Sequence, residues 1–136
     1  ITWPAHCEVH ERFTPQEIRQ YRRVHPGVTV MAHPECPPAV LAEADCAGST
    51  AQMSEYIRAH NPEKILLVTE CSMSDNLSVE FPETEFVRPC NLCAHMKRIT
   101  LATIRRALET MQTQVSIPSD IAANARRAVE RMLTVC

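Results

Sequence analysis

Short apolar segments that alternate with helix-like segments place the strongest constraint on how this chain folds. Lys64–Thr69 (KILLVT) and Val28–Ala32 (VTVMA) are rich in β-branched and aliphatic residues, which is typical of buried strands. Segments 45–47 and 85–88 are weaker strand candidates. Because helices are predicted between the strands, we expect an α/β fold in which helices cover both faces of a short parallel sheet, in three αβα layers.

Capping residues mark where the predicted helices begin. Thr14-Pro15-Gln16-Glu17 combines a capping threonine, a proline suited to the first helical position and a glutamate that completes a capping box. Ser49 and Thr100 are further capping residues. We expect helices over about residues 15–25, 39–43, 50–60, 75–79, 101–111 and 119–133.

The chemically unusual segments follow the predicted strands. In parallel α/β sheets, ligands bind beyond the carboxyl ends of the strands. The loops expected at those ends are His33–Cys36, Gly48–Thr50, Glu70–Ser72 and Pro89–Cys93. The sequence therefore predicts a functional site at this edge of the sheet.

Composition narrows the class of protein. The 136 residues carry a net charge of −2 and form no basic stripe, so nucleic-acid binding has little electrostatic support. The apolar runs are too short to span a bilayer, so we expect no membrane partner. Seven cysteines, an odd number, fit a secreted disulfide framework poorly. We therefore expect a cytoplasmic domain, where clustered cysteines more often serve metal or redox chemistry.

Three cysteines are candidates for that chemistry. Cys90 and Cys93 have the C-x-x-C spacing, which can hold one metal ion or form a disulfide. A zinc site would need four ligands, and no second C-x-x-C is present. Cys7 lies between His6 and His10, which could be ligands, although a histidine in such a place is more often at the surface. A lone cysteine such as Cys7 is also more often structural.

Two further pairs could contact a ligand. His33 and Glu35 lie in a proline-flanked loop after a buried strand, where an imidazole and a carboxylate could perform general acid–base work. The alternative is a structural turn. Ser49 and Thr50 open a helix whose N-terminal N–H groups favour anions, although an ordinary helix cap explains the same residues.

Five segments, in this order, closely resemble the quinolinate synthase family. Each segment alone is weak evidence, whereas five in the right order are highly specific. The resemblance runs from residue 1 to about residue 111 and continues more weakly through the last predicted helix. The segments are WPAHCEVHERF, AHPECP, AGST, LLVTECSMSDN and FVRPCNLCAHMKRITL.

The resemblance implies a transferase of NAD biosynthesis. Such enzymes condense iminoaspartate with dihydroxyacetone phosphate to give quinolinate, phosphate and water. The family fold has three similar α/β domains around a pseudo-threefold axis. Each domain contributes one cysteine to a single [4Fe–4S] cluster, whose fourth iron acts on substrate as a Lewis acid.

The resemblance also assigns roles to residues. Cys7 matches the middle cluster cysteine and Cys93 the last one, whereas Cys90 matches an accessory cysteine that is not a ligand. His33 and Glu35 match an active-site pair, with Glu35 the candidate general base and His33 a candidate donor to substrate. The remaining substrate contacts carried over from the family are Ser49 and Thr50.

Several family features have no counterpart in this sequence. Many relatives have proline where this chain has Ala94, which changes loop stiffness and leaves the ligand chemistry intact. The first cluster cysteine, a tyrosine-bearing substrate loop and an N-terminal phosphate-binding domain are all unmatched. Because the chain begins at Ile1, we expect a C-terminal portion of a longer enzyme, inactive alone.

The predicted portion has two parts and two rival functions. Residues 1–111 would form the cluster- and substrate-binding domain, and residues 112–136 a helical extension that packs on the missing N-terminal domain. One rival is a non-catalytic metal-binding or thiol-redox module that uses Cys90 and Cys93. The other is a structural α/β interaction domain without ligands.

Overall fold

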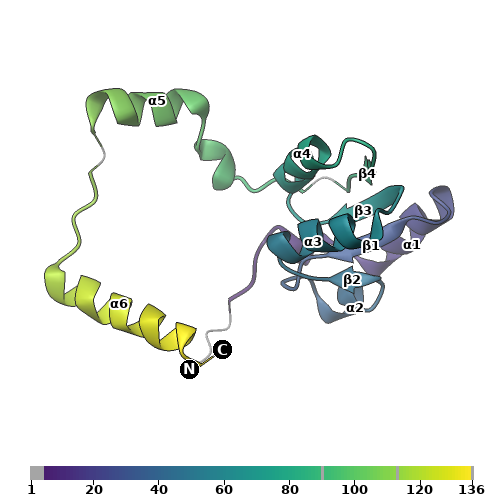
Figure 1. The fold of residues 1–136 in the computed structure, drawn as a ribbon, viewed down its shortest axis with the longest axis horizontal. Helices are drawn as coiled ribbons and strands as arrows, with labels where there is room; N and C mark the ends of the chain where they lie inside the picture. Colours follow the sequence, from purple (N-terminus) through teal and green to yellow (C-terminus); the bar gives the residue numbers. More distant parts are fainter. Residues whose placement is uncertain (1–4, 90, 113, 136) are drawn as a thin grey trace. The chain divides into compact units, whose positions relative to one another are not determined.

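Four parallel strands form the sheet that the alternating pattern predicts (Figure 1). The computed structural model describes residues 5–89, 91–112 and 114–135. The strands lie in the order β2-β1-β3-β4, and every pair is parallel. Their bounds are β1 Thr29–Ala32, β2 Cys46–Ala47, β3 Lys64–Val68 and β4 Glu85–Val87. The predicted α/β class is therefore confirmed.

Six α-helices and two short 3-10 helices complete the described part of the chain. Four of the α-helices, α1 to α4, belong to the unit that contains the sheet, Ile1–Lys97, and the last two belong to a second unit, Arg98–Cys136. The bounds are η1 His10–Arg12, α1 Pro15–Val24, α2 Pro38–Leu41, α3 Thr50–His60, α4 Cys71–Glu80, η2 Met96–Arg98, α5 Leu101–Thr110 and α6 Ser119–Leu133.

The predicted helix caps are present. The Thr14 hydroxyl accepts from the Glu17 N–H at 3.3 Å, and the Glu17 carboxylate accepts from the Thr14 N–H at 3.0 Å. Ser49 and Gln52 form the same reciprocal box at α3. Each box satisfies N–H groups that a helix start leaves without partners, which is why these helices begin where the sequence indicates.

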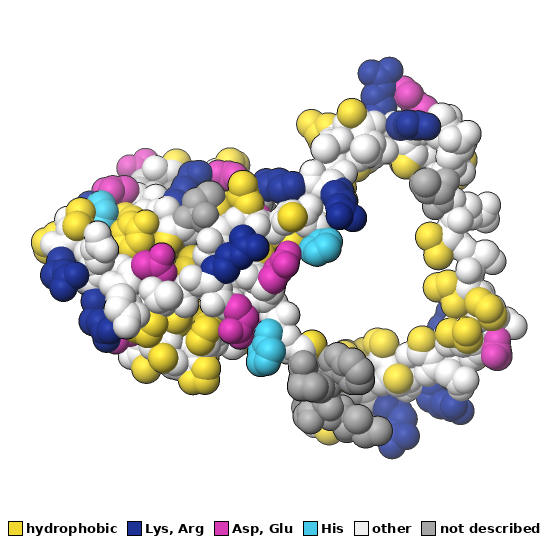
Figure 2. All heavy atoms as spheres, turned by 180° about the vertical axis from the view of Figure 1, so that it is seen from behind, with side chains coloured by type: hydrophobic (Ala, Val, Ile, Leu, Met, Phe, Trp, Pro, Cys, Tyr) yellow, Lys and Arg dark blue, Asp and Glu magenta, His cyan; other side chains and the backbone are white. Residues whose placement is uncertain are grey.

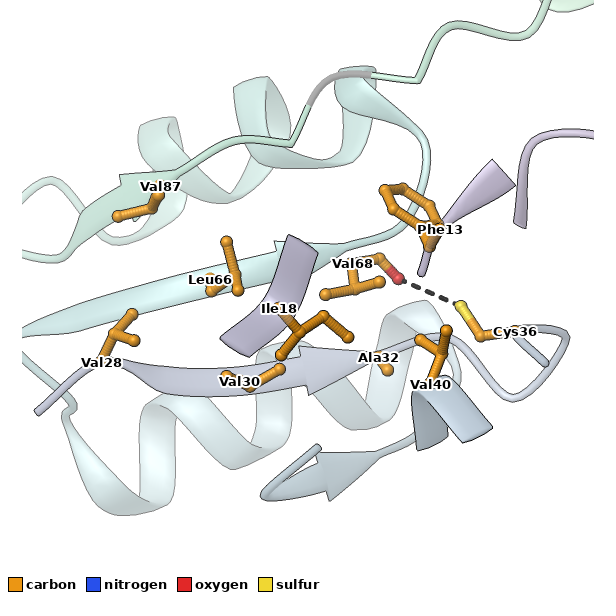
Figure 3. Close-up of a cluster of buried hydrophobic side chains, with 10 residues drawn as sticks. All are labelled: Phe13, Ile18, Val28, Val30, Ala32, Cys36, Val40, Leu66, Val68 and Val87. Atoms are coloured by element: carbon orange, nitrogen blue, oxygen red, sulfur yellow. Dashed lines mark hydrogen bonds between the residues drawn. The ribbon is translucent and has the colours of Figure 1, made fainter. Parts of the chain in front are cut away.

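Alternate side chains along the strands pack on opposite faces of the sheet. Val30 and Leu66 face α1 and α2, whereas Met31 and Leu67 face α3 and α4. Figure 3 shows the first of these cores. It consists of Phe13, Ile18, Val28, Val30, Ala32, Cys36, Val40, Leu66, Val68 and Val87. This period-two pattern accounts for the continuous apolar runs, because both faces are covered.

The chain changes direction across the sheet between β1 and β3. From β1 it passes to β2 on one side, and it then returns to place β3 on the other side of β1. The pairing of β1 with β3 continues past the strand end, where the His33 N–H donates to the Val68 carbonyl at 3.1 Å. Such a reversal leaves a crevice at the carboxyl ends of the two strands.

Helix α4 is longer than the sequence suggests. We predicted a weak helix over 75–79 and a loop at Glu70–Ser72, but α4 begins at Cys71 and ends at Glu80. Glu70 caps it, because its carboxylate accepts from the Ser72 N–H at 2.7 Å. Glutamate is not among the preferred capping residues, so the start carries little sequence signal.

The second unit consists of α5 and α6 and carries no strand in its described residues. Thr100 caps α5 as predicted. Figure 2 shows apolar side chains at the surface of this unit. The exposed ones include Leu101, Leu108 and Met132. No described helix is long and apolar enough to cross a membrane. The predicted division between residues 111 and 112 stays a prediction.

Candidate functional site

A cavity of about 470 Å³ lies at the carboxyl ends of β1 and β3. Its walls come from five parts of the chain: the N-terminal segment, the loop after β1, the start of α3, the end of β3 with α4, and the segment around Cys93. The predicted residues that line it are Cys7, His33, Glu35, Thr50 and Cys93. The structure therefore brings together residues up to 86 positions apart in the sequence.

His10 is the central buried group of this cavity. It is 6% exposed, so the interpretation of this histidine as a surface residue is wrong. Its Nδ1 lies 3.1 Å from the Glu35 carboxylate, and its Nε2 lies 3.1 Å from the Thr69 hydroxyl. His6, in contrast, has a largely exposed side chain and pairs with Glu11.

The surroundings of His10 favour a neutral imidazole. Burial lowers its pKa below 6.5, and the neighbouring His33 lowers it further, while Glu35 opposes both effects. A carboxylate can only accept a hydrogen bond, so Nδ1 carries the ring proton and donates the hydrogen bond to Glu35. The other nitrogen, Nε2, then accepts from the Thr69 hydroxyl. This assignment follows from the hydrogen-bond network.

His33 stacks on His10 and also lines the cavity. The two rings are nearly parallel, with centroids 4.4 Å apart and planes 7° apart. The His33 Nδ1 accepts from the Glu35 N–H at 3.3 Å, so the ring proton of neutral His33 resides on Nε2. The Glu35 carboxylate lies 3.6 Å from His33 Nδ1, beyond hydrogen-bond range, and more than half of its side chain is exposed.

The free cysteines of the described residues fall into two groups. Cys7 and Cys93 are free, half-buried thiols that line the cavity. Cys36 is buried beside it, donates to the Val68 carbonyl, and has a pKa raised to about 11, chiefly by burial. Cys46 lies on β2, outside the cavity lining. The other member of the predicted C-x-x-C pair, Cys90, lies outside the described residues.

Of the two helix-opening residues, only Thr50 lines the cavity. Ser49 is occupied as the cap of α3, where its hydroxyl accepts from the Gln52 N–H at 3.4 Å. The helix-cap interpretation thus applies to Ser49, and the ligand-contact interpretation agrees with the position of Thr50 at the candidate site.

Three side chains with different ligand atoms could together hold a single cation. A thiol of Cys7, a ring nitrogen of His10 and a carboxylate oxygen of Glu35 all lie within 4.8 Å of one another. The chain turns between Cys7 and η1, where the Glu11 N–H donates to the Cys7 carbonyl at 3.1 Å, and this turn keeps residues 7 and 10 close together. The Cys-x-x-His spacing is the only local signal for it.

A second hollow, of about 580 Å³, lies at the opposite edge of the sheet. It is lined by residues that precede or begin β1 and β2, including Thr29 and Asp45. Its main charges are already paired, because the Arg22 guanidinium lies 2.9 Å from the Asp45 carboxylate. Although larger, this hollow lacks thiols and lies away from the carboxyl ends of the strands.

Comparison with known proteins agrees with the motif set. A family model described as quinolinate synthetase A protein matches residues 1–134. The chain belongs to this family. It is 64% identical over 135 residues to quinolinate synthase 2 of Mesorhizobium japonicum. It is also 60% identical over 135 residues to the quinolinate synthase of Xylella fastidiosa, and 50% identical over 133 residues to that of Caulobacter vibrioides.

The alignments cover nearly all of this chain but a smaller part of its relatives. They include 99%, 99% and 98% of the chain, and 42%, 40% and 36% of the three relatives in the same order. The chain thus spans about two fifths of the length of the curated quinolinate synthases that it matches.

Proposed function

We propose that the full-length protein is a quinolinate synthase that condenses iminoaspartate with dihydroxyacetone phosphate, releasing phosphate and water. The observation that carries this proposal is the shared cavity. Two free thiols, an imidazole–carboxylate pair and a helix-opening threonine line one hollow of about 470 Å³. The names of the relatives support the same activity and a role in NAD biosynthesis.

The thiols fit a [4Fe–4S] cluster. Soft thiolates are the ligands that such clusters use, and Cys7 and Cys93 are both free and half-buried at the cavity wall. We propose these two as ligands, with the third cysteine outside this chain. When bound, the cluster would supply a Lewis-acidic iron at its open fourth position.

Glu35 and His33 are the proposed acid–base groups. The Glu35 carboxylate combines an exposed face with one anchored oxygen, so it can remove a proton from a substrate while its position stays fixed. The His33 Nε2–H can donate to a substrate carboxylate or hydroxyl. Neither group needs to move into the site, because both already line the cavity.

Thr50 and the start of α3 are proposed to receive an anionic substrate group. The N–H groups of the first helical turn carry a partial positive charge, and the Thr50 hydroxyl adds a donor. Both substrates are anions, so this wall complements their charge. Ser49 would contribute the proton of its hydroxyl, since the Ser49 N–H donates to the Gln52 side chain and the hydroxyl oxygen only accepts in the cap.

The two parts of the chain would serve different purposes in the complete enzyme. Residues 1–111 would provide the cluster- and substrate-binding domain, and residues 112–136 would pack on the N-terminal domains. The apolar side chains exposed on α6 support such a contact. We propose that the enzyme acts in the cytoplasm, without nucleic-acid or membrane partners, and that the 136 residues alone are inactive.

The test is anaerobic reconstitution of the full-length protein with iron and sulfide. Quinolinate formation and the cluster absorption band would be measured in Cys7→Ala, Cys93→Ala and the control Cys46→Ala. We expect the first two variants to lose the band and the activity, and Cys46→Ala to keep both. A wild-type protein that takes up no cluster would refute the proposal.

A centre for a single metal ion is a second candidate, supported by the group Cys7, His10 and Glu35. Binding of Fe²⁺ or Zn²⁺ would be measured by equilibrium dialysis without sulfide. A single-ion centre would survive Cys93→Ala and be lost in His10→Gln. The thiol-redox alternative predicts instead a reversible Cys90–Cys93 disulfide that forms without iron.

A further inference from the structure

Glu70 is a buried carboxylate that the proposed chemistry does not use. It is 9% exposed and forms one wall of the cavity at the end of β3. Its two oxygens accept hydrogen bonds from different segments: Oε2 from the Ser72 N–H at 2.7 Å and Oε1 from the Cys93 N–H at 3.3 Å. A single side chain thus joins the start of α4 to the backbone of a cavity thiol.

Two further contacts fasten the same segment to the start of α4. The Cys71 N–H donates to the Asn91 carbonyl at 3.2 Å, within a parallel bridge between Glu70 and Asn91. The Lys97 ammonium donates to the Ser72 hydroxyl at 2.9 Å. Residues 91, 93 and 97 are therefore held by residues 70, 71 and 72. Of these contacts, only the Glu70 carboxylate reaches the N–H of Cys93 itself.

We propose that Glu70 is a positioning residue that fixes the Cys93 thiol for metal binding. The inference rests on the proposed function, since it assigns Cys93 a ligand role. The segment around Cys93 has little regular structure of its own before η2 at Met96. Hydrogen bonds to a charged acceptor are stronger than neutral ones of the same length, so the charge of Glu70 strengthens this bond, which is long at 3.3 Å.

The amide structure of glutamine makes Glu70→Gln a selective probe. Glutamine retains one acceptor oxygen, which we expect to keep the shorter bond to Ser72 and the start of α4. Its NH₂ group would then face the Cys93 N–H, where two donors cannot pair. Glu70→Ala removes both bonds. The matched control is Glu83→Gln, which neutralises an exposed glutamate outside the cavity lining.

Hydrogen exchange of the full-length, cluster-free protein measures the restraint directly. We expect the Cys93 amide to exchange about tenfold faster or more in Glu70→Gln and Glu70→Ala, as for loss of a bond to a charged group. Exchange in β3 should equal that of wild type. Unchanged Cys93 exchange, or an equal rise throughout β3, would overturn a local positioning role.

Iron release after reconstitution links the restraint to metal binding. We expect both Glu70 variants to lose iron to a chelator about tenfold faster or more than Glu83→Gln does, because the same bond is missing. Faster exchange with unchanged iron release would overturn the inference while leaving the proposed function intact. A wild-type protein that binds no cluster would instead refute the proposed function, and with it the metal-positioning role.

Discussion

The hydrogen bond between Thr69 and His10 can be removed with almost no change in side-chain shape. Thr69→Val replaces the hydroxyl by a methyl group at a residue that is 5% exposed, so neither a cavity nor a new surface is created. The His10 Nε2, which the Thr69 hydroxyl reaches at 3.1 Å, then lacks a partner in a buried site. Leaving a buried polar group unpaired costs about 1–3 kcal/mol.

Urea denaturation of the 136-residue chain, followed by circular dichroism, would measure that cost. With a slope of about 1–3 kcal/mol per molar urea, a loss of about 2 kcal/mol lowers the midpoint by about 1 M. The control is Thr29→Val, on the neighbouring strand, whose half-buried hydroxyl makes no hydrogen bond within the described residues. We expect its midpoint to stay within about 0.3 M of wild type, as for substitutions without such a mechanism.

A double-mutant cycle separates the bond from other effects of valine. In a His10→Phe background the imidazole nitrogen is absent, so Thr69→Val should cost little. The coupling between the two sites should be about 1 kcal/mol or more. An equal midpoint shift in both backgrounds, or equal shifts for Thr69→Val and Thr29→Val, would refute the assignment of a stabilising role to this bond.

Three further predictions concern titration, packing and thiol reactivity. The pKa of His10 is lower in the folded state than its ordinary 6.5, so the unfolded chain binds more protons as the pH falls through 6.5. The free energy of unfolding should therefore decrease as the pH falls through this range. His10→Phe should flatten this pH dependence in urea titrations. Leu66→Ala, at 0% exposure, should cost about 2–5 kcal/mol, whereas Val79→Ala, at 84%, should cost less than about 0.5 kcal/mol by the same denaturation. Cys36, buried and with a pKa of about 11, should react with iodoacetamide more slowly than Cys7 at neutral pH, as mass spectrometry of the cluster-free chain would show.

The fold was largely predictable because its signals are local. Capping boxes at Thr14 and Ser49 set two helix starts, and apolar runs on strands covered from both sides identified β1 and β3. The start of α4 was not predictable in the same way. Its cap is Glu70, and the carboxylate that satisfies the first turn also serves a segment more than twenty residues later.

The outline of the candidate site was predictable from the sequence, but its buried centre at His10 was not. The rule that ligands bind beyond the carboxyl ends of parallel strands placed His33, Glu35 and Cys93 at one edge, and the cavity lies there. The burial of His10 depends on Thr69, 59 residues away, and on Glu35, 25 residues away. No local pattern contains such contacts, so a histidine beside a cysteine could not be distinguished from a surface residue.

The position of Cys7 connects the two kinds of chemistry proposed for the cavity. A thiol of Cys7 and a carboxylate oxygen of Glu35 lie within 4.8 Å of each other, and both share His10 as a neighbour. Any metal group held by Cys7 would therefore lie beside the carboxylate proposed to remove a proton from substrate. Because His10 is favoured in its neutral form, it adds no positive charge that would neutralise Glu35. Under the proposed function, the carboxylate would then act as a base next to a Lewis acid, and the proposed condensation with loss of water would use both.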